Sequence, residues 1–371
     1  MSDPDTLDVA LVGPADRDDQ ARLFGRCFAK PARVEALRWR YDDNPQGQAV
    51  SLVLRPPSGE AVCSYAYVPR LARAKGPGGN PVQGVIGQQG DVMTDPDWQR
   101  KGLARKLVDH CARETGAAGF VMNWGFPNRQ SAPVFLKFGW RSVGEIRPKR
   151  FIVRADAVAK RRRLADGRMA QLRVGFDARA CRKARSRLAP LSAGVELRPM
   201  TRFKPWAEDL EAIGAALRER FPLVLERDAA FLDWRFVDTP SKVHRILGAF
   251  RGGHLVGYVV VQPPSEWGPE GVGFLVDLAA LEEDLVEGLM GAGLDVLGEL
   301  GASVVEAWSV DGSWWADRLD RAGFRAARPE NHLYVYHYVL TPEHPLAGAP
   351  ALGDASTWYL TDGDRDDELM G

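Results

Sequence analysis

Cysteine, histidine and net charge are all scarce in this sequence. Its 371 residues include four cysteines and six histidines, and 49 basic residues balance 49 acidic ones. Cys27, Cys63, Cys111 and Cys181 form no C-x-x-C pair, so the spacing predicts neither a disulfide framework nor a zinc ribbon. The histidines follow no metal-ligand pattern such as H-E-x-x-H, and we expect no metal site.

Long apolar runs are absent as well. No stretch reaches the roughly 18 apolar residues that span a bilayer, and the acidic start of the chain lacks the cationic-then-apolar order of a secretory signal. We therefore expect a cytoplasmic protein with no membrane span. Because the formal net charge is zero, no global field draws the chain toward nucleic acid, which argues against a nucleic-acid partner.

The most informative stretch begins at Val85. Residues from Val85 to Thr94 are typical of a buried strand, Asp95-Pro96-Asp97 is turn chemistry, and a helical period of apolar residues follows. A helix therefore begins near Gly102. Basic side chains surround its first turn: Arg100, Lys101, Arg105 and Lys106. Unpaired amides at a helix N-terminus, with cations around them, form a site for a phosphate or pyrophosphate.

Two elements of the chain match a family pattern. The pattern Gln/Arg-x-x-Gly-x-Gly/Ala is matched by Gln99–Ala104, and Asn128–Trp140 is similar to an Asn-x-x-Ala-x-x-x-Tyr-x-x-x-Gly-Phe element. In both, the sequence resembles the GNAT superfamily of acyl-CoA N-acyltransferases. The resemblance implies that the turn binds the pyrophosphate of acetyl-CoA or another acyl-CoA, and that the preceding strand and Asn128 meet its pantetheine arm. The implied cofactor-binding residues are Val92, Met93, Thr94, Gln99, Arg100, Lys101, Gly102, Leu103, Ala104 and Asn128.

The catalytic side chains depart from the family pattern. The glutamate base of some members falls on Gln88, whose amide accepts no proton, and the tyrosine that protonates the leaving thiolate falls on Phe135. Asp91 is a nearby carboxylate, but strand parity places it on the opposite face from Gln88. It would serve as a base only if a bulge intervenes or a water relays the proton. Gln88 and Asp91 are the catalytic candidates, and Tyr65 and Tyr67 are further hydroxyls that could reach the site.

The second half of the chain echoes the first. Phe231–Pro240 repeats Ala36–Pro45 with Trp-Arg-aromatic in register, and a hairpin and a strand follow in both halves. The sequence predicts an α+β fold of two tandem GNAT-type domains, each a mixed, mostly antiparallel sheet flanked by helices. Around Gly288, four carboxylates replace the cations of the first turn, so we expect no coenzyme A site there. Trp39 and Trp234 should pack in the core or between the domains.

These patterns divide the chain into four parts. They are a cofactor-binding domain at 1–155, a basic helical linker at 156–190, a degenerate second domain at 191–345 and an acidic tail at 346–371. A final hairpin of Trp140–Ile146 and Arg150–Arg154 should close the first domain. In the tail, Trp358 and Tyr359 should pack on the body of the protein while the carboxylates face the linker.

The leading hypothesis is an acyl-CoA-dependent N-acyltransferase, most simply an acetyltransferase, acting on a small-molecule or peptide amine. The second domain would help to form the acceptor groove or a homodimer surface. Two alternatives stay open. One is an aminoacyl-tRNA-dependent transferase of the peptidoglycan-bridge type, which pairs two such folds and would use Arg161 to Arg163. The other is a non-catalytic acyl-CoA-binding scaffold, which Gln88 and Phe135 would suit.

Overall fold

The computed structural model describes most of the chain. The described residues are 6–28, 32–57, 59–154, 179, 182–186, 188–240, 242–266, 268–328, 333–348 and 352–365. Most of the predicted basic linker, with Arg161 to Arg163 and Cys181, lies outside them, as do the last residues of the acidic tail. No helix of the described part has the length and apolar character to cross a membrane.

Strands and helices alternate through residues 8–152, the first half. The strands are β1 (Asp8–Leu11), β2 (Val50–Arg55), β3 (Cys63–Lys75), β4 (Pro81–Thr94), β5 (Phe120–Gly125) and β6 (Arg141–Ile152). The helices are α1 (Arg17–Phe28), α2 (Val34–Tyr41), α3 (Leu103–Ala117) and α4 (Ala132–Lys137). The predicted strand before the signature turn and the predicted helix after it are thus both present, as β4 and α3.

The second half, residues 195–339, has a similar order of elements. Its strands are β7 (Val195–Met200), β8 (Leu223–Leu225), β9 (Arg245–Arg251), β10 (His254–Gln262), β11 (Val272–Ala280), β12 (Val304–Val310), β13 (Arg325–Ala326) and β14 (Leu333–Val339). Its helices are α7 (Ala207–Arg220), α8 (Ala229–Phe236), α9 (Val286–Glu299) and α10 (Trp314–Ala322). A short strand, β15 (Trp358–Tyr359), follows in the tail and pairs with β8.

One continuous sheet joins the two halves, and corresponding strands of the two halves occupy corresponding places counted from either edge. The order is β1-β2-β3-β4-β5-β14-β6-β12-β11-β10-β9-β7. Neighbours are antiparallel except β4 with β5 and β11 with β12, which are parallel in each half. The mixed sheet with helices on its faces confirms the predicted α+β class, and the matching pair of parallel junctions reflects the echo seen in the sequence.

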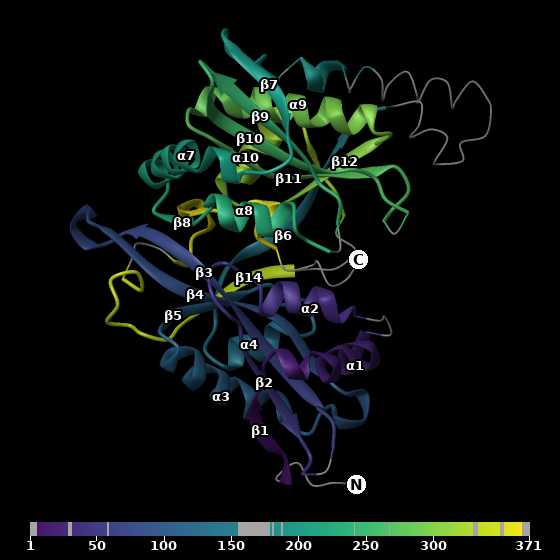
Figure 1. Ribbon diagram of the computed structural model, residues 1–371, viewed down its shortest axis with the longest axis vertical. Coiled ribbons are helices and arrows are strands. Elements are labelled where there is room, and N and C mark those ends of the chain that lie inside the picture. Colours follow the sequence, from purple (N-terminus) through teal and green to yellow (C-terminus); the bar gives the residue numbers. More distant parts are fainter. Residues whose placement is uncertain are drawn as a thin grey trace, which may run out of the picture.

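The two halves exchange their last strands at the centre of this sheet. β14, from the end of the second half, pairs with β5, while β6, from the end of the first half, pairs with β12 (Figure 1). The hairpin predicted between Trp140 and Arg154 is therefore wrong, because β6 is one unbroken strand. It needs no turn, since its first part pairs with β14 and its second part, from Ile146 to Ile152, pairs with β12.

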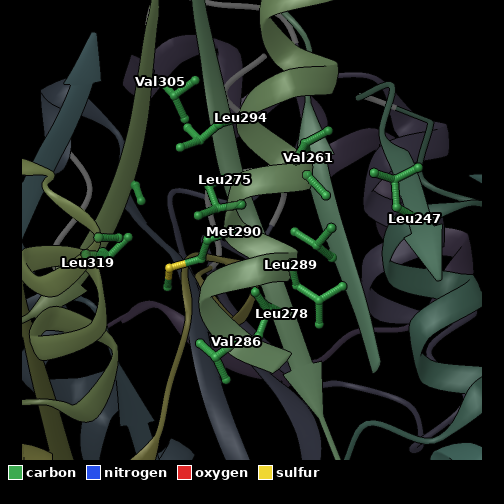
Figure 2. Close-up of a cluster of buried hydrophobic side chains, with 14 of the residues drawn as sticks. Leu247, Val261, Leu275, Leu278, Val286, Leu289, Met290, Leu294, Val305 and Leu319 are labelled. Carbon is green, nitrogen blue, oxygen red and sulfur yellow. The ribbon is translucent and has the colours of Figure 1, made fainter. Parts of the chain in front are cut away.

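Helices cover both faces of the sheet in each half, and they bury separate cores. In the first half α3 and α4 pack over one face, whereas α1 and α2 pack over the other. In the second half α9 lies across the sheet and inserts Val286, Leu289, Met290 and Leu294 among side chains of the strands beneath it (Figure 2). A further core mixes residues of both halves, such as Trp124 and Val310, with Trp358 of the tail.

The tail runs back between the halves. Trp358 and Tyr359 are each 1% exposed, as expected of residues packed on the body. The carboxylate of Asp364, however, does not face the linker segment. It accepts hydrogen bonds from Arg70 at 3.2 Å and from Arg227 at 2.5 Å, which belong to the first and second halves. The expectation for this carboxylate was wrong because its partners are internal arginines that sequence proximity does not reveal.

Candidate active site

The turn between β4 and α3 is exposed and left-handed. Arg100 has a φ of +61° and Gly102, the N-cap of α3, has a φ of +78°. A Cβ added at Gly102 would meet nothing within 4 Å, and no side chain caps the first turn of the helix. The first amides of a helix have no intrahelical partner. The turn therefore presents backbone donors to open space, which fits an anionic group.

A second helix fixes the start of this turn. Arg26 of α1 binds the buried carboxylate of Asp95 and also lies 3.0 Å from that of Asp97. The hydrogen bond from Arg26 holds the pKa of Asp95 below its ordinary value. Asp95 in turn accepts a hydrogen bond from the amide of Asp97. The turn is thus anchored at its base while its tip stays free.

The basic residues of the turn differ in their contacts. Lys101 lies over the ring of Trp98, with 4.6 Å from its Nζ to the ring centroid, and Lys106 donates to the carbonyl of Leu7 at 2.8 Å. Arg100 is exposed and has no ion-pair partner within the described ranges. The first turn of α3 contains no acidic residue. The local charge around the free amides is therefore positive, as the sequence indicated.

β4 extends beyond its parallel partner. The two strands β4 and β5 pair up to Gln89 and Gly125, where β5 ends, while β4 continues to Thr94. Among the described strands, this extension of β4 pairs only with β3. The predicted pantetheine partners Val92, Met93 and Thr94 all lie in it. An extended ligand could therefore meet strand backbone here on its way to the turn.

Asn128 stands at the entrance of α4, on the far side of β5. Its Oδ1 accepts hydrogen bonds from the amides of Gln130 at 2.9 Å and Ser131 at 3.0 Å. The residue is exposed, and in the described structure its Nδ2 has no partner. The side-chain oxygen is engaged in the turn, so the nitrogen is the group that could meet a pantetheine arm.

A bulge in β4 changes the direction of Asp91. The β3–β4 ladder shifts register between Ser64 and Ala66, so Asp91 and Val92 together oppose one residue of β3. Asp91 has a φ of +49°, in the left-handed region that such bulges use. Its carboxylate accepts a hydrogen bond from the hydroxyl of Tyr41 in α2. The residue therefore faces α2 rather than α3.

Helix α2 holds this carboxylate in a buried setting. Nη1 of Arg40 lies 3.7 Å from the Asp91 carboxylate. Burial raises the pKa of Tyr41 well above its ordinary value, and Asp91 raises it further, so the hydroxyl remains a hydrogen-bond donor. Arg40 also lines a small cavity with Gln88. Asp91 and Gln88 thus lie on the same face of the sheet, the one that α2 covers, although strand parity predicts opposite faces.

Gln88 contacts the tail of the protein. Its side chain is buried, and its Nε2 donates to the backbone carbonyl of Asp364 at 2.7 Å. Sequence reasoning missed both the tail and the Arg40–Tyr41 pair as parts of this site. The Trp-Arg-aromatic repeat that contains Arg40 and Tyr41 was the available signal, but it gave no indication that the pair lies beside Asp91.

The other candidate hydroxyls point away from Asp91. Tyr65 and Tyr67 are 2% and 1% exposed in the core beneath α3, together with Phe135. Burial raises the pKa of both tyrosines. Tyr336 joins this cluster from the exchanged strand β14, a contribution of the second half that the sequence did not predict. Tyr65 and Tyr67 are therefore packing residues in this structure.

The corresponding turn of the second half is covered by protein. A Cβ added at Gly288 would lie 2.9 Å from the side chain of Leu191. Arg318 of α10 binds Glu287 at 2.9 Å and also binds Glu283. Hydrocarbon and carboxylates therefore occupy the place where the first half has open space and basic side chains. This arrangement supports the expectation that only the first half holds a pyrophosphate.

The three described thiols are not activated: Cys63 and Cys111 are buried and Cys27 is partly buried. Burial raises the pKa of Cys27 to about 11 and that of Cys63 to about 12, and raises that of Cys111 as well. No group of three or more histidine, cysteine, aspartate or glutamate residues in the described part could hold a metal ion.

Comparisons with known proteins agree with this geometry. A family model described as an acetyltransferase (GNAT) domain matches residues 8–143, which include the signature turn and Asn128. No curated protein matches the sequence.

Three solved structures share the fold. One is a probable N-acyltransferase of unknown function from Enterococcus faecalis, at 12% identity over 91% of this chain and 73% of that one, with a TM-score of 0.63. A GCN5-related N-acetyltransferase from Kribbella flavida has 16% identity over 92% and 73%, with a TM-score of 0.60. The N-myristoyltransferase of Saccharomyces cerevisiae with bound myristoyl-CoA has 13% identity over 90% and 79%, with a TM-score of 0.57.

At such low identities, the structural similarities show a common fold. The family match covers the part of the chain that carries the open, basic turn. Residues 8–143 of this chain therefore match the acetyltransferase (GNAT) domain family, and the chain shares its fold with solved N-acyltransferases.

Proposed function

We propose that the protein is an acyl-CoA-dependent N-acyltransferase, most simply an acetyltransferase, with its acyl-CoA site in the first half. The open turn from Gln99 to Ala104 is the observation that carries this proposal. Its left-handed glycine, its free helix amides and the exposed Arg100 fit a pyrophosphate. The second half would then act as a partner that completes the site rather than as a second site.

The proposed binding roles for the parts of acyl-CoA follow one another along β4 and into α3. The turn and the first residues of α3 would hold the pyrophosphate, the extension of β4 from Val92 to Thr94 would hold the pantetheine arm, and the Nδ2 of Asn128 would contact it. When bound, the acyl-CoA supplies an activated thioester carbonyl. The chain itself has to orient the acceptor amine and remove its proton.

Asp91 is the proposed general base. Its carboxylate faces α2, where the Tyr41 hydroxyl and Arg40 fix its orientation. A carboxylate held by two neighbours can accept a proton from an amine directly or through one water. Gln88 would act as a positioning residue, since its side chain holds the tail segment at Asp364.

Binding of acetyl-CoA, measured by isothermal calorimetry, tests the cofactor site. The full-length protein should bind, and Gly102→Trp should abolish binding because the indole would fill the open space over the turn. Gly119→Trp is the matched control, since Gly119 follows the same helix with a φ of +82° and also has nothing within 4 Å of an added Cβ. Equal binding by both variants, or no binding by the wild type at several hundred micromolar, would refute the proposal.

Turnover against a panel of amines tests the base. Asp91→Asn should lower kcat by about a hundredfold while leaving acetyl-CoA affinity unchanged. Tyr41→Phe should give a smaller loss, because it removes only an orienting hydrogen bond. Asp109→Asn, an exposed change on α3, should have no effect. Unchanged turnover in Asp91→Asn would exclude Asp91 as the base.

A further inference from the structure

A cleft of about 470 Å³ opens between α2 and α8, where the two copies of the repeated segment meet. Its lining consists of four pairs, and the members of each pair are 195 positions apart. They are Glu35 with Ala230, Trp39 with Trp234, Asp43 with Asp238, and Pro45 with Pro240. The repeat found in the sequence therefore surrounds one cavity.

Two indoles form the floor of this cleft. The rings of Trp39 and Trp234 stack with 4.6 Å between centroids and 18° between planes. Each indole N–H donates to the backbone carbonyl of the other tryptophan at 2.9 Å. Because both N–H groups are satisfied and the residues are 5% and 8% exposed, the rings are fixed in orientation and offer a small aromatic surface to the cleft.

The walls above the floor are acidic. Three of the eight lining residues are carboxylates and none is basic. Asp238 is paired with the exposed Arg202 at 2.6 Å, and Arg33 reaches the carbonyl of Pro240 from outside the lining. Glu35 and Asp43 are exposed and have no ion-pair partner in the described part of the chain. Carboxylates beside aromatic surface attract an organic cation and repel an anion.

The cleft leads toward the signature strand. Trp39 and Trp234 also line a small inner cavity of about 20 Å³, enough for one water molecule, whose wall holds Gln88 and four arginines, Arg40, Arg70, Arg235 and Arg365. The Nε of Arg70 is buried there without a hydrogen-bond partner among the described residues, so the inner cavity has a donor to offer to a water or a ligand oxygen. The helix that supplies Trp39 also supplies Tyr41, which holds Asp91. The cleft and the proposed base thus share one face of the sheet.

We propose that this cleft binds the acceptor, and that the acceptor is a small aliphatic amine with more than one amino group. One ammonium group lies between Asp43 and Asp238 over the indole floor. The reacting amine lies toward Gln88 in its uncharged form, because the four arginines of the inner cavity repel a second positive charge. This inference rests on the proposed N-acyltransferase function for the role of the ligand, whereas the binding itself can be measured without any reaction.

Calorimetry with putrescine and with butanediol, its uncharged analogue of the same length, tests the inference on the full-length protein. Putrescine should bind and butanediol should not, and putrescine affinity should fall as salt is raised. The double variant Asp43→Asn with Asp238→Asn should weaken putrescine binding about tenfold, consistent with two solvent-exposed charge contacts. Asp295→Asn, an exposed change on α9 far from this lining, should bind like the wild type.

Acetyl-CoA binding measured on the same samples separates the two proposals. If acetyl-CoA fails to bind while putrescine binds, the proposed function is wrong and the cation site stands. If acetyl-CoA binds but putrescine binds no better than butanediol, or the double variant binds putrescine like the wild type, the inference about the cleft is overturned. Intrinsic fluorescence of the double variant, compared with the wild type, establishes that the floor is intact.

Discussion

The carboxylate of Asp364 gives the most direct test of how the tail holds the halves together. It is 2% exposed and accepts hydrogen bonds from Arg70, Arg227 and the amide of Thr361. Burial alone would raise its pKa, but Arg227 and Arg70 outweigh burial and keep the pKa below its ordinary value. Asp364→Ala would remove the negative charge and leave two buried guanidinium groups in place.

The expected loss of stability depends on the partners that each arginine retains after the substitution. Arg227 retains Asp277, whose carboxylate lies 3.3 Å away. Arg70 retains only its contact over the ring of Phe231, at 4.0 Å, among the described residues. Burial already lowers the pKa of Arg70 to about 10. Removing one partner of a buried ion pair destabilises a protein by about 3–5 kcal/mol, and the surviving Asp277 favours the lower end, about 3 kcal/mol.

Urea unfolding followed by tryptophan fluorescence and by circular dichroism measures this loss, provided that the two probes coincide. Asp295→Ala is the control, because Asp295 and its partner Arg185 are both exposed and should contribute at most about 1 kcal/mol. Replacing the pair with hydrocarbon, as Arg70→Met with Asp364→Leu, should recover part of the loss. An unfolding free energy of Asp364→Ala within about 1 kcal/mol of the wild type would refute the reasoning.

Three further predictions test other parts of the fold. Burial, aided by Arg141, lowers the pKa of His337 to about 4. The neutral ring therefore contributes its full stability above pH 6.5, and this contribution, up to about 3 kcal/mol, should be lost as the pH falls toward 4. Urea unfolding at each pH should show this loss in the wild type and not in His337→Gln. Trp39→Ala and Trp234→Ala should each destabilise by about 3–5 kcal/mol, and a double-mutant cycle should show coupling of about 1 kcal/mol. Leu289→Ala should cost about 2–5 kcal/mol in the core of the second half, without changing acetyl-CoA affinity of the folded protein.

Local patterns in the sequence were sufficient to predict the strand and the helix around the signature turn. The apolar run ending at Thr94, the turn residues after it and the helical period from Leu103 all act over a few residues. Their outcome in the structure, β4 followed by α3, depends little on distant parts of the chain. The helix start near Gly102 was likewise predicted from these local residues, whereas the left-handed φ of +78° at this glycine is known only from the structure.

Long-range pairings were not readable in the same way. The exchange of β6 and β14 joins strands almost two hundred residues apart. The alternation of apolar and polar residues in each strand is compatible with many neighbouring strands, so it does not predict this pairing. The bulge at Asp91 was named as a condition but could not be predicted, because strand parity carries no information about where a register shift falls. Asp364 looked like part of an acidic tail since nothing near it in sequence marks Arg70 and Arg227 as its partners.

The filled turn at Gly288 in the second half is consistent with the other contacts of that half. That half supplies β14 as a neighbour of β5, Trp234 to the floor of the cleft and Arg227 as a partner of the tail. None of these contributions needs an open turn at Gly288, and the space there is taken by Leu191. The second half therefore contributes structure that the first half lacks, because without it β5 would keep only β4 as a neighbour and the cleft would lose one side.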